Sequence, residues 1–285
     1  LDGGMALIPY NREGRRVKGV VRMNINHIKN PYDASLYRTG ISVGDYPVDH
    51  HHARYPGKVP EIEFPPIPAY NIPMGALIPE TIDGLIVCEK GISVTNIVNG
   101  TTRLQPVVLL TGQAAGVLAA KTVQLKKKVR EVPVRLVQEE LLKMKTYLMP
   151  FVDVKPTDPH WEAIQKVGVT GILKGTGKAE GWGNKMCFFP DSLVTIQTLP
   201  YREKENSFMT LDDLGYAVWK MYNNNISGKE ISRQDFFKAY TGFIELTNKT
   251  QYRPLSLVFR REVAVVVDHF LKPIKIQVNH AGEKK

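Results

Sequence analysis

The pattern of apolar and polar positions divides the chain into a first part with short extended runs and a later part with helical spacing. Over residues 14–23 basic and apolar side chains alternate (GRRVKGVVRM), which predicts a strand with one solvated face. The Pro- and Tyr-rich stretch over residues 30–70 excludes long helices and favours loops and edge strands that wrap a sheet. We therefore expect residues 1–70 to form a β-rich region.

A short apolar run follows a turn in the next part of the chain. Residues 84–89 (GLIVCE) are apolar on both faces for most of their length, which predicts a buried strand of a parallel sheet. Cys88 lies in this run, and we expect its thiol to be buried and inert. The sequence has one other cysteine, Cys187, and neither belongs to a CxxC pair, which excludes a disulfide framework.

A long helix is expected after this run. It begins near residues 101–106 and continues to about Lys126, because Pro106 suits a first turn and lysines suit a helix end. Gly112 and Gly116 share one face of this helix. Glycine inside a helix costs about 1 kcal/mol relative to alanine, so we expect another backbone to pack closely on that face.

Beyond residue 130 the pattern is mainly helical. A helix is expected over residues 133–149, and Pro150 marks the expected domain boundary, so that residues 71–150 and 151–285 form separate regions. Residues 174–185 are too rich in glycine for regular structure. Ser232 is expected to cap one of the later helices. Amphipathic spacing predicts those helices over residues 161–167, 210–222, 232–240 and 259–271.

Composition narrows the class of protein. A chain of 285 residues has room for two domains, and a hydrophobic content of 43% is that of a globular protein with no expected membrane span. The net charge of +10 favours anionic ligands, but basic residues cluster only over 126–130 and at the C-terminus, and no nucleic-acid recognition motif accompanies them. No nucleic-acid partner is expected. The compartment stays open, with the periplasm and the cell exterior among the options.

One continuous stretch carries the strongest signal for function. A helix N-terminus has unpaired N–H groups and about half a positive charge, which suits an anionic or electron-rich ligand. The ordered motifs GLIVCE (84–89), NGTTR (99–103) and GQAAG (112–116) resemble the C-terminal flavin-contacting segment of FAD-dependent oxidoreductases related to the fumarate-reductase-like flavoproteins. Residues 12–19 and 41–51 also resemble segments of that family, so the resemblance covers roughly residues 10–125.

The resemblance implies a fold class of α/β and α+β: the C-terminal part of a Rossmann-like FAD-binding domain with a β-rich substrate region, followed by a mainly helical domain. It implies FAD as the cofactor, with Glu89 near the ribityl or pyrophosphate part. It also implies that Gly112 and Gly116 pack the helix against the cofactor domain. The residues that it implies at the flavin ring edge are Thr101, Thr102, Arg103 and Gln105.

Two departures from the family pattern matter. Asn99 stands where many relatives have histidine, which puts a proton-handling role there in doubt. The strand, G-x-G-x-x-G turn and helix that hold the FAD pyrophosphate are missing, and the glycines at 175 and 177 do not replace them. The chain also starts at Leu1 rather than Met. We expect an N-terminal FAD-binding half as its partner, and little or no FAD and no activity in this chain alone.

A histidine cluster supplies the candidate catalytic residues. On an extended segment side chains alternate, so His50 and His52 would share one face and could bind a metal ion or transfer protons. The resemblance implies that this segment lies near the substrate, which favours acid–base chemistry, and the catalytic candidates are His50, His51 and Arg54. The alternative is that one histidine packs in the core while the others are solvated. No metal is expected.

The C-terminal region resembles a different module. The surroundings of Phe151, Trp161 and Phe189 resemble an S-layer homology motif, whose first helix packs Trp and Ile inward, and residues 259–264 (FRREVA) resemble the segment that opens a later helix. Residues 195–198 lack the arginine expected there. Such modules often bind cell-wall polysaccharide. A packing role, against the oxidoreductase domain or between subunits of a homo-oligomer, stays open as the alternative.

The leading hypothesis is an FAD-dependent oxidoreductase that transfers hydride between flavin and an organic substrate, with carbohydrate-related compounds among the candidates. A polysaccharide lyase is the second hypothesis, because relatives of this architecture are sometimes labelled xanthan lyases. Lyase chemistry needs a base and a cation, for which His51 and Arg54 are available. The third hypothesis is a non-enzymatic glycan-binding or interaction module formed by the C-terminal helices.

Overall fold

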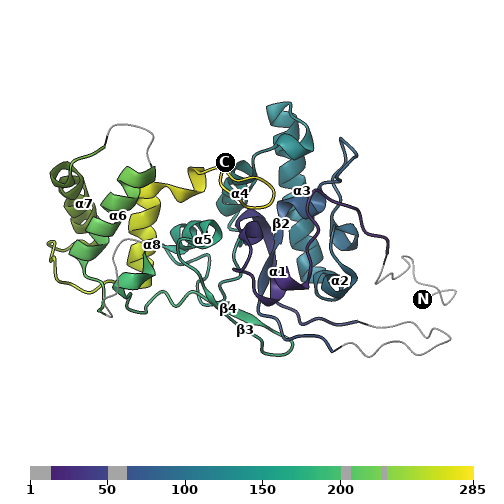
Figure 1. The fold of residues 1–285 in the computed structure, drawn as a ribbon, viewed down its shortest axis with the longest axis horizontal. Coiled ribbons are helices and arrows are strands. Elements are labelled where there is room, and N and C mark those ends of the chain that lie inside the picture. Colours follow the sequence, from purple (N-terminus) through teal and green to yellow (C-terminus); the bar gives the residue numbers. More distant parts are fainter. Residues whose placement is uncertain (1–13, 51–62, 200–206, 226–229) are drawn as a thin grey trace. The chain divides into compact units, whose positions relative to one another are not determined.

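The computed structural model describes residues 14–50, 63–199, 207–225 and 230–285 (Figure 1). Its α-helices are α1 (Ile25–Lys29), α2 (Asn96–Thr102), α3 (Gln105–Leu125), α4 (Val134–Lys143), α5 (Trp161–Thr170), α6 (Leu211–Asn225), α7 (Arg233–Asn248) and α8 (Arg260–Leu271). Its strands are β1 (Gly40–Gly44), β2 (Tyr70–Pro73), β3 (Thr176–Lys178) and β4 (Lys185–Cys187). Short 3-10 helices are η1 (Ser35–Thr39), η2 (Met74–Leu77), η3 (Glu89–Gly91), η4 (Val129–Glu131), η5 (Ile196–Thr198) and η6 (Pro273–Lys275).

The chain forms two compact units. The first unit consists of the described parts of Leu1–Phe151, Thr176–Met186 and Gln277–Lys285. The second consists of the described parts of Val152–Gly175 and Cys187–Ile276. A single boundary at Pro150 does not describe this division, because two segments from far beyond that residue belong to the first unit.

Two buried strands lie at the centre of the first unit. β1 and β2 pair antiparallel, with Ser42 opposite Ile72 and Gly44 opposite Tyr70, and every residue of β2 is buried. α3 packs on β1 and on α4. The helix predicted from about 101–106 to Lys126 is confirmed as α3, which has a proline in its first turn and ends where Lys126 takes a left-handed conformation with φ 51°.

α4 is shorter than the helix predicted over residues 133–149. It ends at Lys143 because Lys145 has φ 57°, and the N–H groups of Met144, Lys145 and Thr146 turn back to bond the carbonyls of residues 140–142. Leu148 is still fully buried. The apolar spacing therefore continues past the helix end, in a stretch of chain that packs without being helical.

The strand predicted over residues 84–89 is absent, and that prediction is wrong. Gly84 has φ 73°, Leu85 is 43% exposed, and Cys88 is half-buried rather than buried. The N–H of Val87 donates to the carbonyl of Leu77 at 2.8 Å, but no neighbouring strand pairs with this run within the described ranges. A buried parallel strand needs partners on its edges and layers over both faces. An apolar run does not supply those by itself.

The region over residues 1–70 contains less β-structure than predicted, as far as it is described. It holds α1, η1, β1 and the first residue of β2. The strand predicted over residues 14–23 is replaced by isolated bridges from Gly19 to Pro79 and from Met23 to Val94. Alternation shows which face of a segment is apolar, whereas a ladder also needs a partner in register.

Residues 174–185 contain regular structure that was not predicted. β3 and β4 form a two-stranded sheet, and the N–H of Ala69 donates to the carbonyl of Lys185 at 3.4 Å. A Cβ at Gly177 would collide with the ring of Pro68. Glycine at this position therefore permits close packing of β3 on the chain that precedes β2.

The C-terminal segment also belongs to the first unit. The hydroxyl of Ser35 donates to the carbonyl of Ala281 at 2.7 Å, and His280 Nε2 lies 2.9 Å from the carbonyl oxygen of Arg130. Burial lowers the pKa of His280. Gly282 has φ 82° and leaves no room for a Cβ beside Ser35, so the last residues are fitted tightly to η1.

The second unit is mostly helical in its described residues. α8 packs on α5 and α6, and Trp161 at the start of α5 is fully buried. The Ser232 side chain accepts from the N–H of Asp235 at 3.1 Å, which confirms its predicted role as the cap of α7. The four helices predicted in this region are confirmed as α5, α6, α7 and α8, and the first three extend beyond their predicted ends.

Asn71 joins β2 to two other segments from a buried position. Its Nδ2 donates to the carbonyls of Tyr37 at 2.8 Å and Leu148 at 3.0 Å. We expect Asn71→Ala to lower the free energy of unfolding by about 1–3 kcal/mol in urea denaturation, because it removes two buried hydrogen bonds. Asn96→Ala, at an exposed position, should change it by less than about 0.5 kcal/mol. Equal effects of the two substitutions would contradict this role for Asn71.

Candidate functional site

The end of α2 is bonded to the segment that carries the predicted histidines. Arg103 is the C-cap residue of α2 and is 7% exposed. Its guanidinium donates to the backbone carbonyl of Asp49 at 2.8 Å and lies 3.7 Å from the Asp49 carboxylate. A buried cation is tolerated where it is paired and hydrogen-bonded. Arg103 therefore holds the chain in place at Asp49.

Thr101 bonds the same segment three residues earlier. Its hydroxyl donates to the carbonyl of Tyr46 at 2.5 Å, and the fully buried hydroxyl of Tyr70 lies 2.7 Å from Thr101 Oγ1. Since the Thr101 proton goes to the carbonyl, Tyr70 donates to Thr101. Burial raises the pKa of Tyr70 far above its usual value, which keeps this phenol protonated as a donor. The two bonds form one buried chain from β2 to Tyr46.

His50 lies directly against α2. Its Nε2 is 3.1 Å from the carbonyl oxygen of Ile97, an arrangement that requires a proton on that nitrogen. A Cβ at Gly100 would lie 2.6 Å from the Asp49 carbonyl oxygen and 2.9 Å from His50 Nε2. Gly100 thus permits this close approach. Sequence reasoning did not single it out as a site residue, although its place in the NGTTR motif was a signal.

The other predicted cofactor residues fall into two groups. Thr102 is buried, and its hydroxyl donates to the carbonyl of Val98 one helical turn earlier at 3.2 Å. Glu89 and Gln105 are exposed, and Glu89 has φ 61° at the start of η3. Thr102, like Thr101 and Arg103, thus donates to a backbone carbonyl within the first unit. The exposed members are available to a ligand.

Within the described residues, α3 has one buried face and one open face. Val107, Ala114 and Leu118 are buried, whereas Leu109 is 72% exposed and Val123 is 77% exposed. At Gly112 and Gly116 no described atom lies within 4 Å of the Cβ position, so the close backbone contact predicted for these glycines is not made by the described residues. The helix begins at an exposed Gln105 with no side-chain cap.

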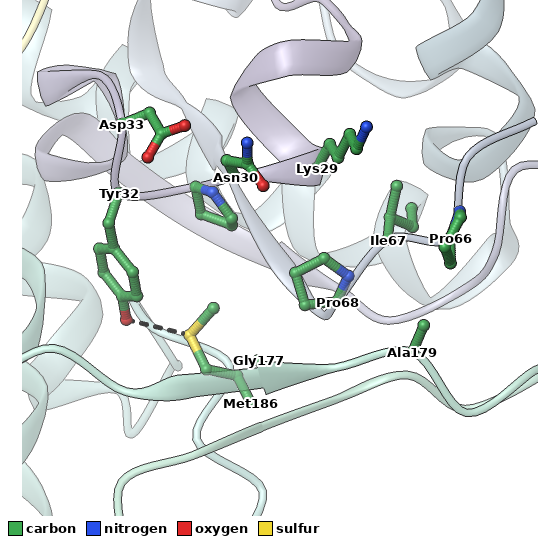
Figure 2. A pocket seen from close by; sticks show the side chains of 11 residues that line it. Lys29, Asn30, Tyr32, Asp33, Pro66, Ile67, Pro68, Gly177, Ala179 and Met186 are labelled. Atoms are coloured by element: carbon green, nitrogen blue, oxygen red, sulfur yellow. Dashed lines mark hydrogen bonds between the residues drawn. The ribbon is translucent and has the colours of Figure 1, made fainter.

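Figure 2 shows a separate hollow of about 340 Å³ in the first unit. The Tyr32 hydroxyl donates to the sulfur of Met186 at 3.1 Å across one side of it. None of the predicted site residues that are described lines this hollow. Its walls come from the end of α1 and the chain after it, from the segment before β2, and from β3, β4 and the chain between them: Lys29, Asn30, Pro31, Tyr32, Asp33, Pro66, Ile67, Pro68, Gly177, Ala179 and Met186.

The remaining catalytic candidates, His51 and Arg54, lie outside the described residues, as does His52. Within the described ranges, no three side chains of His, Cys, Asp or Glu cluster in a way that would hold a metal ion. Among the described helices, α3 alone is long and apolar enough to cross a membrane. Length and composition are weak evidence, because the core helix of a globular protein meets the same criteria, and α3 is therefore not assigned as a membrane span.

Residues 3–141 match the family model of FAD dependent oxidoreductases. The matched range, just under half of the chain, contains β1, β2, α2 and α3 and every predicted catalytic and cofactor residue. The match supports an oxidoreductase role, and the matched family implies FAD binding by the full-length protein. Searches of the curated proteins and of the solved structures returned no match for the chain.

The buried bonds of Thr101 can be tested by a double-mutant cycle with Tyr70. We expect Thr101→Val to cost about 1–3 kcal/mol in urea unfolding, because the Tyr70 hydroxyl loses its partner. Adding Tyr70→Phe removes that orphaned hydroxyl. The double variant should therefore lose about 1 kcal/mol less free energy of unfolding than the two single variants lose together.

Tyr240→Phe is the matched control for this cycle. The Tyr240 hydroxyl donates to the Leu211 carbonyl at 2.7 Å, in the second unit. The losses in free energy of unfolding caused by Tyr240→Phe and by Thr101→Val should be additive within about 0.5 kcal/mol. If the cycle with Tyr70 proved equally additive, the Tyr70–Thr101 bond would contribute nothing to stability.

Proposed function

Because residues 3–141 match the family of FAD dependent oxidoreductases, we propose that the full-length protein transfers hydride between FAD and an organic substrate, and that the first unit borders the flavin ring. The bound flavin would supply the redox chemistry. The observation that carries the proposal is the start of α3: its first residue is exposed and no side chain caps it. A helix start of this kind offers unpaired N–H groups to the electron-rich edge of a flavin.

The structure supports different roles for the residues grouped at the ring edge. Gln105 is exposed at the helix start and would contact the flavin directly. Arg103 and Thr101 donate to backbone carbonyls of the segment at residues 45–50. Their side chains would therefore position that segment, and Thr102 would stabilise α2 by its bond to Val98. Glu89 is exposed and would remain available to the ribityl or pyrophosphate part.

His50 would work on the substrate side. Its Nε2 proton is directed at the Ile97 carbonyl, so an acid–base role would have to use Nδ1. Asp49 and His50 are adjacent, and the Arg103 bond to Asp49 fixes where both lie. His51 and Arg54 would follow on the same segment, and they also supply the base and cation of the lyase hypothesis. No contact within the described residues favours the lyase over the oxidoreductase.

The open face of α3 would meet the nucleotide-binding half of the full-length protein. Leu109 and Val123 are exposed there, and Gly112 and Gly116 offer room for a close backbone contact. Apolar side chains gain about 25 cal/mol for each Å² removed from water, so covering this face stabilises an assembly. The same surface is also available to another copy of the chain.

For the second unit we propose an S-layer-homology-like module with a packing role. Trp161 and Ile164 are fully buried, as the inward-packing positions of the first helix require. Arg260 at the start of α8 donates to the carbonyls of Phe188 at 2.7 Å and Lys174 at 2.8 Å, and its guanidinium lies 4.7 Å from the centre of the Phe188 ring. The arginine of this motif thus joins the parts of the unit internally.

In the full-length protein we expect Arg103→Ala to release FAD more readily or to slow flavin reduction, because the Asp49 segment loses its buried donor. Flavin absorbance after gel filtration and stopped-flow reduction measure the two effects. A change of about tenfold corresponds to 1.4 kcal/mol, the scale of one charged hydrogen bond. Arg253→Ala, at an exposed position in the second unit, is the control. Unchanged retention and unchanged reduction would remove Arg103 from the site.

Gly112→Leu tests the open face of α3. Outside the neighbouring helix backbone no described atom lies within 4 Å of the added Cβ, so the isolated chain should fold as before, with a stability gain of up to about 1 kcal/mol from helix propensity. In the full-length protein the bulky side chain should prevent flavin loading. Gly242→Leu is the matched control, since Gly242 lies in α7 and also has an open Cβ position. Normal flavin loading by Gly112→Leu would contradict the proposed contact.

A further inference from the structure

A tryptophan stands exposed in the loop between β3 and β4, residues 179–184, hereafter the β3–β4 loop. Trp182 is 74% exposed, and its neighbours are Gly181 and Gly183, whose Cβ positions have no described atom within 4 Å. It is the one large apolar side chain of this loop. Tryptophan is highly buried on average, and its large apolar ring with a polar N–H makes it enriched at binding interfaces.

The backbone of the β3–β4 loop is fixed to the first unit. Asn184 is 2% exposed; its N–H donates to the carbonyl of Asp45 at 2.8 Å, and its Oδ1 accepts from the N–H of Glu180 at 2.8 Å. Its Nδ2 is buried with no acceptor among the described residues. The Asn184 bonds thus attach the loop to the segment that leads into Tyr46, so Trp182 is presented from a defined position.

Trp182 and Tyr46 together form an aromatic corner. Their ring centres are 5.3 Å apart and the rings are inclined by 46°. The carbonyl of Tyr46 accepts the Thr101 hydroxyl, and burial and the charge of Asp49 raise the pKa of the Tyr46 phenol while Arg103 opposes them. Tyr46 therefore lies within the electrostatic reach of the Asp49–Arg103 pair. The aromatic corner borders the proposed flavin site.

Charged side chains surround the aromatic corner, and they favour a ligand that combines an apolar face with polar groups. Glu180 forms ion pairs with Lys178 at 2.7 Å and Lys185 at 2.5 Å, and hydrogen bonds from these two lysines lower the pKa of Glu180 to about 2. Asp45 is exposed beside the Asn184 anchor. A wholly apolar ring would remove water from these groups without replacing its hydrogen bonds, which is unfavourable. A pyranose has apolar C–H faces for the indole and hydroxyls around its edge for the charges.

We propose that Trp182 and Tyr46 form a stacking subsite for a pyranose ring, which makes a carbohydrate the substrate class of this protein. The role as a substrate subsite rests on the proposed oxidoreductase function, whereas sugar binding itself does not. One face of the sugar packs on the indole, the Tyr46 ring limits its position, and the loop residues bond its hydroxyls. Trp182 is thereby a specificity residue and not a catalytic one.

The test is saturation-transfer difference NMR on the chain as it exists, without flavin. The probes are the methyl glycosides of glucose, galactose and mannose, N-acetylglucosamine and cellobiose, with benzyl alcohol as the apolar ring. We expect saturation transfer from the protein to the C–H protons of at least one sugar. The dissociation constant of that sugar should be about tenfold larger in Trp182→Ala, because an aromatic contact is lost. Trp182→Tyr should retain part of the binding.

Trp219→Phe is the control, since Trp219 lies in α6 of the second unit and should leave sugar binding unchanged. Transfer to none of the sugars, equal binding by Trp182→Ala, or transfer to benzyl alcohol alone would overturn the subsite. Any of these results would leave the proposed oxidoreductase function standing, because that function is tested separately by the flavin experiments with Arg103→Ala. Conversely, Trp182-dependent sugar binding in a full-length protein that holds no flavin would support the subsite and remove the oxidoreductase function.

Discussion

The first unit depends on how the backbone carbonyls of one irregular segment are satisfied. Residues 45–50 belong to neither a helix nor a strand, so their polar groups need partners from elsewhere. Arg103 donates to Asp49, Thr101 donates to Tyr46, and the N–H of Asn184 donates to Asp45. Three donors from two distant parts of the chain thus give this segment one position. His50, Tyr46 and the β3–β4 loop have their places because of it.

The long helix α3 poses a second constraint, because it is apolar on more sides than the described residues cover. Its inner face packs on β1 and α4, while Leu109 and Val123 remain exposed. An isolated surface residue of this kind is ordinary, but a helix with apolar residues on both faces is usually enclosed on both. This open face is the one proposed above to meet the nucleotide-binding half of the full-length protein.

Local signals predicted the helices well and the strands poorly. Pro106 and the lysines that follow residue 125 were enough to locate α3, and Ser232 was enough to locate the start of α7, because caps and first turns are made by neighbours in sequence. The run at residues 84–89 has the composition of a buried strand, yet Leu85 is exposed. β3 and β4 were missed, since the bond from Ala69 to Lys185 joins residues more than a hundred positions apart.

For the candidate site, the sequence determined which residue types are available and which family they resemble. Arg103 and Thr101 were singled out because their motif resembles that family, and His50 because an imidazole can transfer protons and the same resemblance places its segment near the substrate. Only the tertiary structure decided that Arg103 meets Asp49, that Gly100 gives His50 room, and that Trp182 stands beside Tyr46. The physical reason is that these contacts are made across long sequence separations. Their geometry depends on packing, which no local pattern encodes.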